Sequence, residues 1–479
     1  MADKQTLLKQ HRRKKRIGIA IVAMVVLLSG PTFGWWLPFL LAISGFVVHE
    51  VWLSDHQFYA PGQDYRFQFP TGATAITVAV QDDGRLVFPR VFDIAPDDTV
   101  ILAVSLQATL PGRILDPCIV LSAGDAAQTQ TFERSTGGLR YLNLTGWSHS
   151  ILDSSLRLAA RYCRFAPSGQ LWVFKHPDFL QKRLLVVAPH ADDAELAAFG
   201  LYSQAREAWL VTLSAGEIEA GNYRKMTGSP AAAACLKGRL RAWDSVVVPR
   251  WARIPGKQCF QLGYFCLQLP AMQASPDAPV GSREAELCDT RPFRVFNETP
   301  LPGDAEGHPT WNALKADLRS ILDLARPEVI VLPHPHLDPH PDHVCAYQAI
   351  TEVLADASGH QPETLLCYAN HLHINDLWPM GPAHTGVALP PRFEEGTAGS
   401  PYVLVLDEKL QRDKAMALGM MHDLQGALSF KKSLRRRLQT IFAGRRWPAY
   451  GENDFFRKAV RRHELFWVCK PGGQEEPVP

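Results

Sequence analysis

The chain has 479 residues, a formal net charge of +2 and a hydrophobic content of 46%. This length is too great for one ordinary core, and the composition is that of a folded protein, which excludes a disordered chain. We expect at least two domains and no nucleic-acid partner. The nine cysteines include no C-x-x-C pair, so we expect reduced thiols and a reducing compartment.

The N-terminal 53 residues predict a membrane anchor. Residues 1–16 form a basic, cytoplasmic N-terminus, with seven Lys and Arg between positions 4 and 16. Residues 17–53 then make an apolar run nearly twice the roughly 20 residues that cross a bilayer. The interruption at Gly30-Pro31 favours two short transmembrane helices, residues 17–32 and 35–52. Three tryptophans are expected to anchor them at the interfaces: Trp35, Trp36 and Trp52.

Two arguments about the topology conflict. Few basic residues follow the apolar run, Arg66 being the first, which favours one span and an external domain. The length of the run and its central Gly-Pro pair favour a hairpin that returns the chain to the cytoplasm. Reduced cysteines agree with the hairpin, so we expect the rest of the chain to face the cytoplasm.

Residues 54–180 predict a β-rich, sandwich-like domain. Short alternating runs are separated by Gly, Pro and Asp at the spacing of an antiparallel sandwich. We interpret this segment as a spacer, while binding of a glycan or a partner stays open. The expected strands are residues 65–69, 75–80, 99–104, 118–121, 140–144, 156–160 and 171–174.

Residues 181–470 predict an α/β domain with a mostly parallel sheet and helices on both faces. Residues 259–309 have little periodicity and are expected to form loops, and residues 471–479 a tail. The expected strands are residues 184–188, 209–213 and 327–333, and the expected helices are residues 194–205, 232–246, 313–324 and 344–354.

Metal-binding residue types follow two of these strands. His190, Asp192 and Asp193 follow the first strand, and residues 334–343, with four His and two Asp, follow the third. Ligand sites in open α/β sheets form at the carboxyl ends of strands. The first loop alone fits a solvated loop equally well, but four imidazoles at one strand end are hard to explain by packing. Together the loops suit a divalent-metal hydrolase in which a free carboxylate activates water.

These residues resemble the LmbE-like, or PIG-L, zinc de-N-acetylase superfamily, whose members remove acetyl from N-acetylated amino sugars. Residues 189–196 and 340–343 carry the resemblance, although Ala191 replaces the usual proline of His-Pro-Asp-Asp. Residues 211–217 and 414–425 match a second loop and a late helix of the family. The resemblance covers about residues 182–469 and leaves the membrane and β-rich segments outside.

The resemblance implies one Zn²⁺ per chain, held by His190, Asp193 and His343. It also suggests, more weakly, that Ser214 and Glu217 line a sugar pocket. These two residues follow the second predicted strand.

Three further residues have catalytic roles by the same resemblance. Asp192 would act as the general base, and His340 would polarise the acetyl carbonyl or its oxyanion. Asp342 would orient a neighbouring imidazole.

Membrane attachment narrows the expected substrate. A lipid-linked sugar would gain from an anchored enzyme, because tethering raises the local concentration. The basic run at residues 431–437 suits anionic headgroups or phosphorylated sugars, although a solvated helix face explains it equally well. We expect an N-acetylated amino sugar of a lipopolysaccharide core precursor, at the bacterial inner membrane, with the catalytic domain facing the cytoplasm.

Two other functions stay open at this point. A metal phosphoesterase also uses His and Asp, but usually needs two metals, for which only His334 and His336 supply further ligands. A glycan-binding protein with an inactive hydrolase domain is the other alternative. The complete set of predicted catalytic and metal-ligating residues argues against it.

Overall fold

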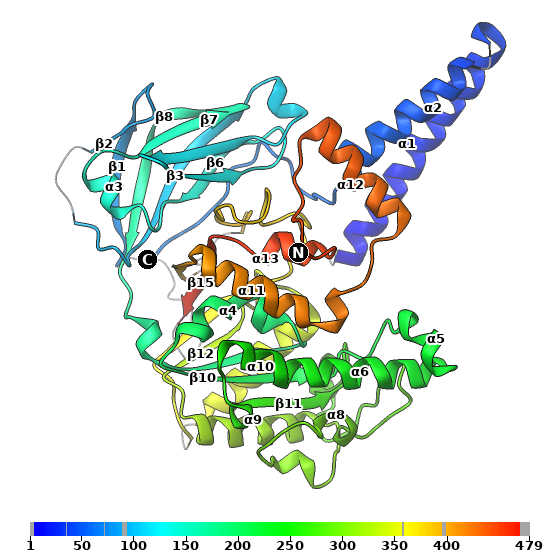
Figure 1. The fold of residues 1–479 in the computed structure, drawn as a ribbon, viewed down its shortest axis with the longest axis vertical. Helices are drawn as coiled ribbons and strands as arrows, with labels where there is room; N and C mark the ends of the chain where they lie inside the picture. Colours follow the sequence, from blue (N-terminus) through cyan, green and yellow to red (C-terminus); the bar gives the residue numbers. More distant parts are fainter. Residues whose placement is uncertain are drawn as a thin grey trace.

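The computed structural model describes residues 4–34, 36–70, 72–88, 93–356, 359–394 and 399–469. Trp35, one of the predicted anchors, and the tail at residues 471–479 lie outside the described residues. A helical hairpin projects from the body of the molecule, beside two antiparallel sheets and a larger α/β unit (Figure 1).

The hairpin consists of α1 (Lys4–Phe33) and α2 (Trp36–Val48), which lie side by side (Figure 1). The helices approach closely at Gly45, where a Cβ atom would lie 3.9 Å from Val22 Cγ1. A π-helical turn, η1 (His49–Leu53), continues α2 into the body. The chain therefore leaves the body and returns to it, as a hairpin requires.

The apolar side chains of the hairpin are largely exposed. Leu28 is 68% exposed and Phe39 65%, although large apolar side chains are normally buried. Within the described part of the chain, Trp36–Leu53 is the one helix long and apolar enough to cross a membrane. The predicted second span has this property, whereas the first was not identified by the same criterion.

The β-rich segment forms a five-stranded sheet, in the order β2-β1-β8-β3-β6, and a three-stranded sheet, β5-β4-β7, both antiparallel. One apolar cluster lies between them and includes Val78, Leu102 and Leu121. A short helix, α3, precedes β7. The bounds are β1 (Thr74–Val80), β2 (Leu86–Val87), β3 (Thr99–Ala108), β4 (Cys118–Ala123), β5 (Ala126–Thr131), β6 (Gly137–Asn143), α3 (Ser148–Leu152), β7 (Arg157–Arg161) and β8 (Cys163–Phe174).

The other face of the five-stranded sheet packs on the α/β unit. Ile101 and Ala103 belong to the same buried cluster as Leu185 and Val187 of the α/β sheet. The predicted strand at residues 65–69 is wrong, because the described structure has no strand there. Its alternation instead reflects burial of Tyr65 and Phe67 in this shared cluster.

The α/β unit is built on a seven-stranded sheet in the order β11-β10-β9-β12-β13-β15-β14. Strands β11 to β13 are parallel, and β15 and β14 pair antiparallel at one edge. The mostly parallel sheet is therefore as predicted. Its strands are β9 (Arg183–Ala188), β10 (Glu207–Ser214), β11 (Cys259–Tyr264), β12 (Val329–Pro333), β13 (Thr364–Tyr368), β14 (Ser400–Val405) and β15 (His463–Cys469).

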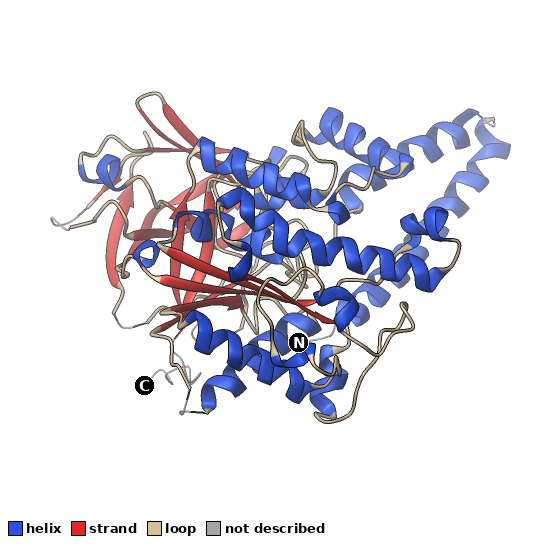
Figure 2. Ribbon diagram, turned by 60° about the horizontal axis from the view of Figure 1, so that its bottom comes forward, coloured by secondary structure: helices blue, strands red, loops and turns tan. Residues whose placement is uncertain are grey.

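Helices cover both faces of this sheet (Figure 2). Leu185 of β9 packs in one apolar cluster and its neighbour Leu184 in the other, because successive side chains of a strand point to opposite faces. The principal helices are α4 (Asp193–Gln204), α6 (Pro230–Val247), α9 (Trp311–Ala325), α10 (Pro341–Ala355), α11 (Glu408–Met420), α12 (Phe430–Ala443) and α13 (Asp454–Ala459).

Residues 259–309 are not loops throughout, contrary to the prediction. The first six form the edge strand β11, in which Gln261 and Gly263 break up the apolar pattern. Short helices α5 (Arg224–Thr227), α7 (Leu269–Ala274) and α8 (Arg291–Arg294) lie in the connections around this edge. The strand order reverses between β9 and β12, and in open α/β sheets ligand sites form at such a switch point.

Candidate metal centre

The loop after β9 is a tight turn that presents two carboxylates. Asp192 precedes α4 with a φ of 112°, a strained conformation for a residue with a side chain. The backbone N–H of His190 donates to Asp193 Oδ2 at 3.0 Å, which closes the turn. The turn therefore commits the Asp193 carboxylate to a contact with His190, whereas the neighbouring Asp192 carboxylate takes no part in that contact.

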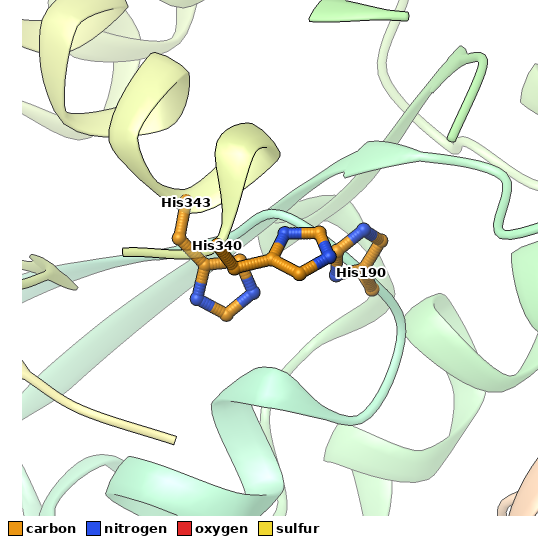
Figure 3. A group of neighbouring side chains, drawn as sticks. All are labelled: His190, His340 and His343. Carbon is orange, nitrogen blue, oxygen red and sulfur yellow. The ribbon is translucent and has the colours of Figure 1, made fainter. Parts of the chain in front are cut away.

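Asp193 lies between two imidazoles. Its Oδ2 is 3.2 Å from His190 Nδ1 and 3.1 Å from His343 Nε2. The rings of His190, His340 and His343 come together from the two loops (Figure 3). The structure thus brings together the three residues predicted to hold zinc, although they are far apart in the sequence.

The loop after β12 runs into the first turn of α10. His340 lies just before the helix, Pro341 begins it, and His343 lies in its first turn. Asp342 Oδ2 is 3.0 Å from His190 Nε2 and accepts the backbone N–H of Leu267 at 2.7 Å. The imidazole that Asp342 contacts therefore belongs to the other loop.

Asp338, to which no role was assigned from the sequence, contacts His343. Its Oδ2 lies 3.0 Å from His343 Nδ1 and accepts the backbone N–H groups of Asn370 and His371 at 2.7 and 3.1 Å. Asn370 also donates from Nδ2 to Asp193 Oδ1 at 2.9 Å. These contacts fix the ring orientation of one predicted metal ligand and the carboxylate of another.

Two features of the donor set fit a metal ion. Ligand atoms of His190, His340 and His343 lie within 4.8 Å of one another, as do those of Asp193, His343 and His371. Within the described residues, His340 Nδ1 and His343 Nε2 are buried without a hydrogen-bond partner, although the latter is at ion-pair distance from Asp193. Imidazole and carboxylate groups at this spacing suit Zn²⁺.

The charges in the centre are strongly coupled. Burial alone would raise the pKa of Asp193, but His343 and His190 hold it well below its usual range. Burial opposes protonation of His343, yet Asp193 and Asp338 raise its pKa to about 10. Metal ligands bind in their deprotonated form, so binding of a divalent cation here would release the proton from His343.

Two further groups, Asp192 and His340, have shifted pKa values that suit them to different roles. Burial raises the pKa of Asp192 to about 6, with Arg241 opposing the shift and Asp193 reinforcing it. Burial, together with His343 and His190, lowers the pKa of His340 to about 3, so this ring is neutral near pH 7. One group can accept a proton and the other can donate a hydrogen bond.

Arg241 of α6 is a functional candidate that the sequence did not reveal. Its Nη2 donates to the carbonyl of Ala191 at 2.6 Å and lies 3.4 Å from Asp192 Oδ1, while Nη1 pairs with Asp423. Gly216, with a φ of 64°, passes so close that a Cβ atom would collide with the guanidinium. Gly216, within the matched run at residues 211–217, was the one hint in the sequence that another group packs closely at this position.

Ser214 and Glu217 lie behind the centre rather than on an open surface. Ser214 Oγ donates to the carbonyl of Pro189 at 2.9 Å, and Glu217 accepts from Cys266 N and Ser282 Oγ at 3.1 and 2.7 Å. Both side chains are fully buried and hold the neighbouring loops. Contact of either residue with a sugar stays a prediction.

The extra histidines of the second loop do not form another metal group among the described residues. His334 Nδ1 accepts the backbone N–H groups of His336 and Leu337, each at 3.2 Å. Its ring also packs edge-on against Trp467. The metal-binding groups found, including one of His190, Cys266 and Asp342, all belong to one centre.

No protein-family profile matches the chain, and no curated protein matches it. N,N'-diacetylchitobiose deacetylase from Pyrococcus horikoshii aligns at 15% identity over 61% of this chain and 86% of its own, with a TM-score of 0.34. The zinc-inhibited form of teicoplanin deacetylase Orf2 aligns at 16% identity over 61% and 100%, with a TM-score of 0.32. GalB, a 4-carboxy-2-hydroxymuconate hydratase from Pseudomonas putida, aligns at 14% identity over 62% and 99%, with a TM-score of 0.31. Likenesses this remote leave the activity to be argued from the site itself.

Proposed function

We propose that this chain is a zinc-dependent de-N-acetylase of an N-acetylated amino sugar carried by a membrane glycolipid. The observation that carries the proposal is the position of Asp193, between the rings of His190 and His343, with Asp192 beside it. Asp193 would bind the metal, whereas the adjacent Asp192 would remain free to transfer a proton. Water and the amide are converted to acetate and a free amine.

His190, Asp193 and His343 would hold the metal. When bound, Zn²⁺ supplies Lewis acidity that favours attack of water on an amide carbonyl. Asp342 and Asp338 contact the two imidazoles and keep their rings in place.

The remaining groups move protons. Asp192 takes a proton from the attacking water as the new C–O bond forms, and passes that proton to the departing amine as the C–N bond breaks. Arg241 pairs with the Asp192 carboxylate and would restrain its position. The neutral ring of His340 donates a hydrogen bond to the oxygen on which negative charge develops.

Membrane attachment is the second part of the proposal, and the exposed apolar hairpin supports it. Helix α12 lies beside the hairpin (Figure 1), and its Arg435 Nε donates to Glu50 Oε2 at 2.6 Å. This helix carries exposed Phe430 and Ile441 among five Lys and Arg residues, a composition that suits an anionic membrane surface. We infer an inner-membrane enzyme with its centre on the cytoplasmic side, acting on a lipopolysaccharide core precursor.

The test is release of acetate from bacterial membrane glycolipid extracts by the full chain in detergent. Asp192→Asn should lower kcat by about 10²- to 10⁴-fold with unchanged zinc content, because the base is lost and the ligands remain. Asp323→Asn, at an exposed position of α9, is the matched control. Unchanged acetate release by Asp192→Asn would refute the base assignment, and no release by the unaltered chain would refute the proposed activity.

Zinc content also separates this proposal from a phosphoesterase. A single centre predicts one zinc per chain, whereas a two-metal phosphoesterase predicts two. Elemental analysis of the purified full chain distinguishes these values.

A further inference from the structure

A cavity of about 460 Å³ lies outside the candidate metal centre. Its floor is the outer face of the three-stranded sheet, including Cys118 and Val120 of β4, while the alternate residue Ile119 points into the apolar cluster. Its walls are residues 377–385 and residues 443–447, the segment at the end of α12. This volume is within the range of pockets that hold small ligands.

The cavity lies at the foot of the hairpin. Arg445, in its wall, pairs with Asp55 and Asp116 at 2.7 and 3.0 Å, and Arg134 joins the same two carboxylates at 3.3 and 2.7 Å. Asp55 follows the last turn of the hairpin by two residues. The network of two arginines and two aspartates therefore fixes the cavity next to the point where the chain enters the proposed membrane segment.

The cavity wall presents more hydrogen-bond donors than acceptors. Asp116 is its one carboxylate, and both arginines of the network already occupy it. Arg161 and Arg446 are exposed and have no carboxylate partner within the described part of the chain. Guanidinium groups only donate, so an oxygen-rich anion is the complementary ligand.

We propose that this cavity binds a phosphate group at the foot of the hairpin, with Arg161 and Arg446 as its donors. A phospholipid headgroup and free phosphate share this chemistry. The inference rests on the membrane attachment within the proposed function and is independent of the hydrolytic reaction.

The test is calorimetric titration of the full chain in a nonionic detergent with three probes. Dihexanoyl phosphatidic acid has a phosphate group on a lipid. Inorganic phosphate has the phosphate without the lipid, and dihexanoylglycerol has the lipid without the phosphate. We expect phosphatidic acid to bind and dihexanoylglycerol not to bind. Arg446→Ala and Arg161→Ala should each weaken binding at least about fivefold, because a charge-assisted hydrogen bond is lost.

A matched control separates the cavity from general charge attraction. Arg412→Ala removes an exposed guanidinium of α11 that does not line the cavity, and should leave affinity within about twofold. Equal losses for Arg412→Ala and Arg446→Ala, binding of dihexanoylglycerol, or no binding of either phosphate probe would overturn the proposal. Tight binding of inorganic phosphate supports it and identifies free phosphate as the source, whereas selectivity for phosphatidic acid identifies a lipid. Asp192→Asn should bind phosphatidic acid normally, so failure of the deacetylase proposal leaves this result interpretable.

Discussion

Arg241 and Asp192 form an ion pair in which the guanidinium Nη2 lies 3.4 Å from the carboxylate Oδ1. The same Nη2 donates to the carbonyl of Ala191 at 2.6 Å, so one side chain holds both the proposed base and its strained turn. A buried charge pair of this kind is sensitive to loss of either partner.

Replacing Arg241 should affect the reaction more than the metal. Arg241→Gln removes the cation and loosens the turn, so we expect kcat to fall about 10- to 100-fold through misplacement of Asp192. Zinc content should stay within error of the unaltered chain. Arg239→Gln, on an exposed face of the same helix, should retain full activity, and parallel loss in both variants would contradict the positioning role.

Replacing Asp338 should affect the metal first. Asp338→Asn removes the carboxylate charge 3.0 Å from His343 Nδ1, and the loss of such a contact lowers metal affinity by about 10- to 100-fold. Chelator competition on the purified variant measures this change.

Removing the metal should stop the reaction. Treatment with excess chelator should abolish acetate release from the unaltered chain, and added Zn²⁺ should restore it. Activity that persists through complete metal removal would contradict the zinc assignment.

A buried ion pair outside the centre predicts a loss of stability. Lys414 Nζ lies 2.8 Å from Glu464 Oε1, and each side chain is 1% exposed. Lys414→Ala should lower the free energy of unfolding by about 3–5 kcal/mol, because Glu464 is left as an unpaired buried charge. Lys409→Ala, at a 76% exposed side chain of the same helix, should have little effect in thermal unfolding. Similar losses in the two variants would argue against the buried pair as the cause.

His463 predicts a pH dependence of stability. Burial, reinforced by Arg462, lowers the pKa of this β15 residue to about 3, below the ordinary value near 6.5. The unfolded chain therefore binds a proton that the folded chain excludes, and stability falls as the pH drops from about 6.5 toward 3, by about 1.4 kcal/mol per pH unit from this group.

The pH prediction is checked with two variants. His463→Gln should show a shallower loss of unfolding free energy between pH 6.5 and 4.5, whereas His149→Gln, at a 94% exposed side chain, should keep the slope of the unaltered chain. Identical slopes for all three chains would rule out His463 as a contributor.

The residues that were predictable from the sequence are those encoded by local patterns. Strand β9 and helix α9 were predicted correctly, because the spacing of their apolar residues matches the faces that they bury. His190 and Asp193 were recognisable because they lie only three positions apart in one short motif. Arg241 was not, because its contacts with Ala191, Asp192 and Asp423 depend on packing between separate elements. Asp338 lies in the same run as His343, but the sequence does not show which carboxylate of that run contacts the ring.

Other differences between the predicted and observed strands arise where a buried alternating segment does not pair, or where a paired strand lacks the apolar pattern. Tyr65 and Phe67 alternate as a strand does, yet their rings pack on the α/β unit without forming a strand. Strand β11 shows the reverse, because a polar Gln261 and Gly263 occupy a paired edge. Periodicity reports which side chains are buried, and only the partner element decides whether a backbone pairs.

The apolar cluster shared by Ile101, Ala103 and Leu185 bears on autonomous folding. A fragment beginning at residue 181 would leave one side of that cluster without its cover and expose contiguous apolar surface to water. Such a fragment is expected to aggregate on expression, although it contains every residue of the candidate metal centre. A fragment beginning near residue 54 keeps the cover and is the smaller unit suited to soluble expression.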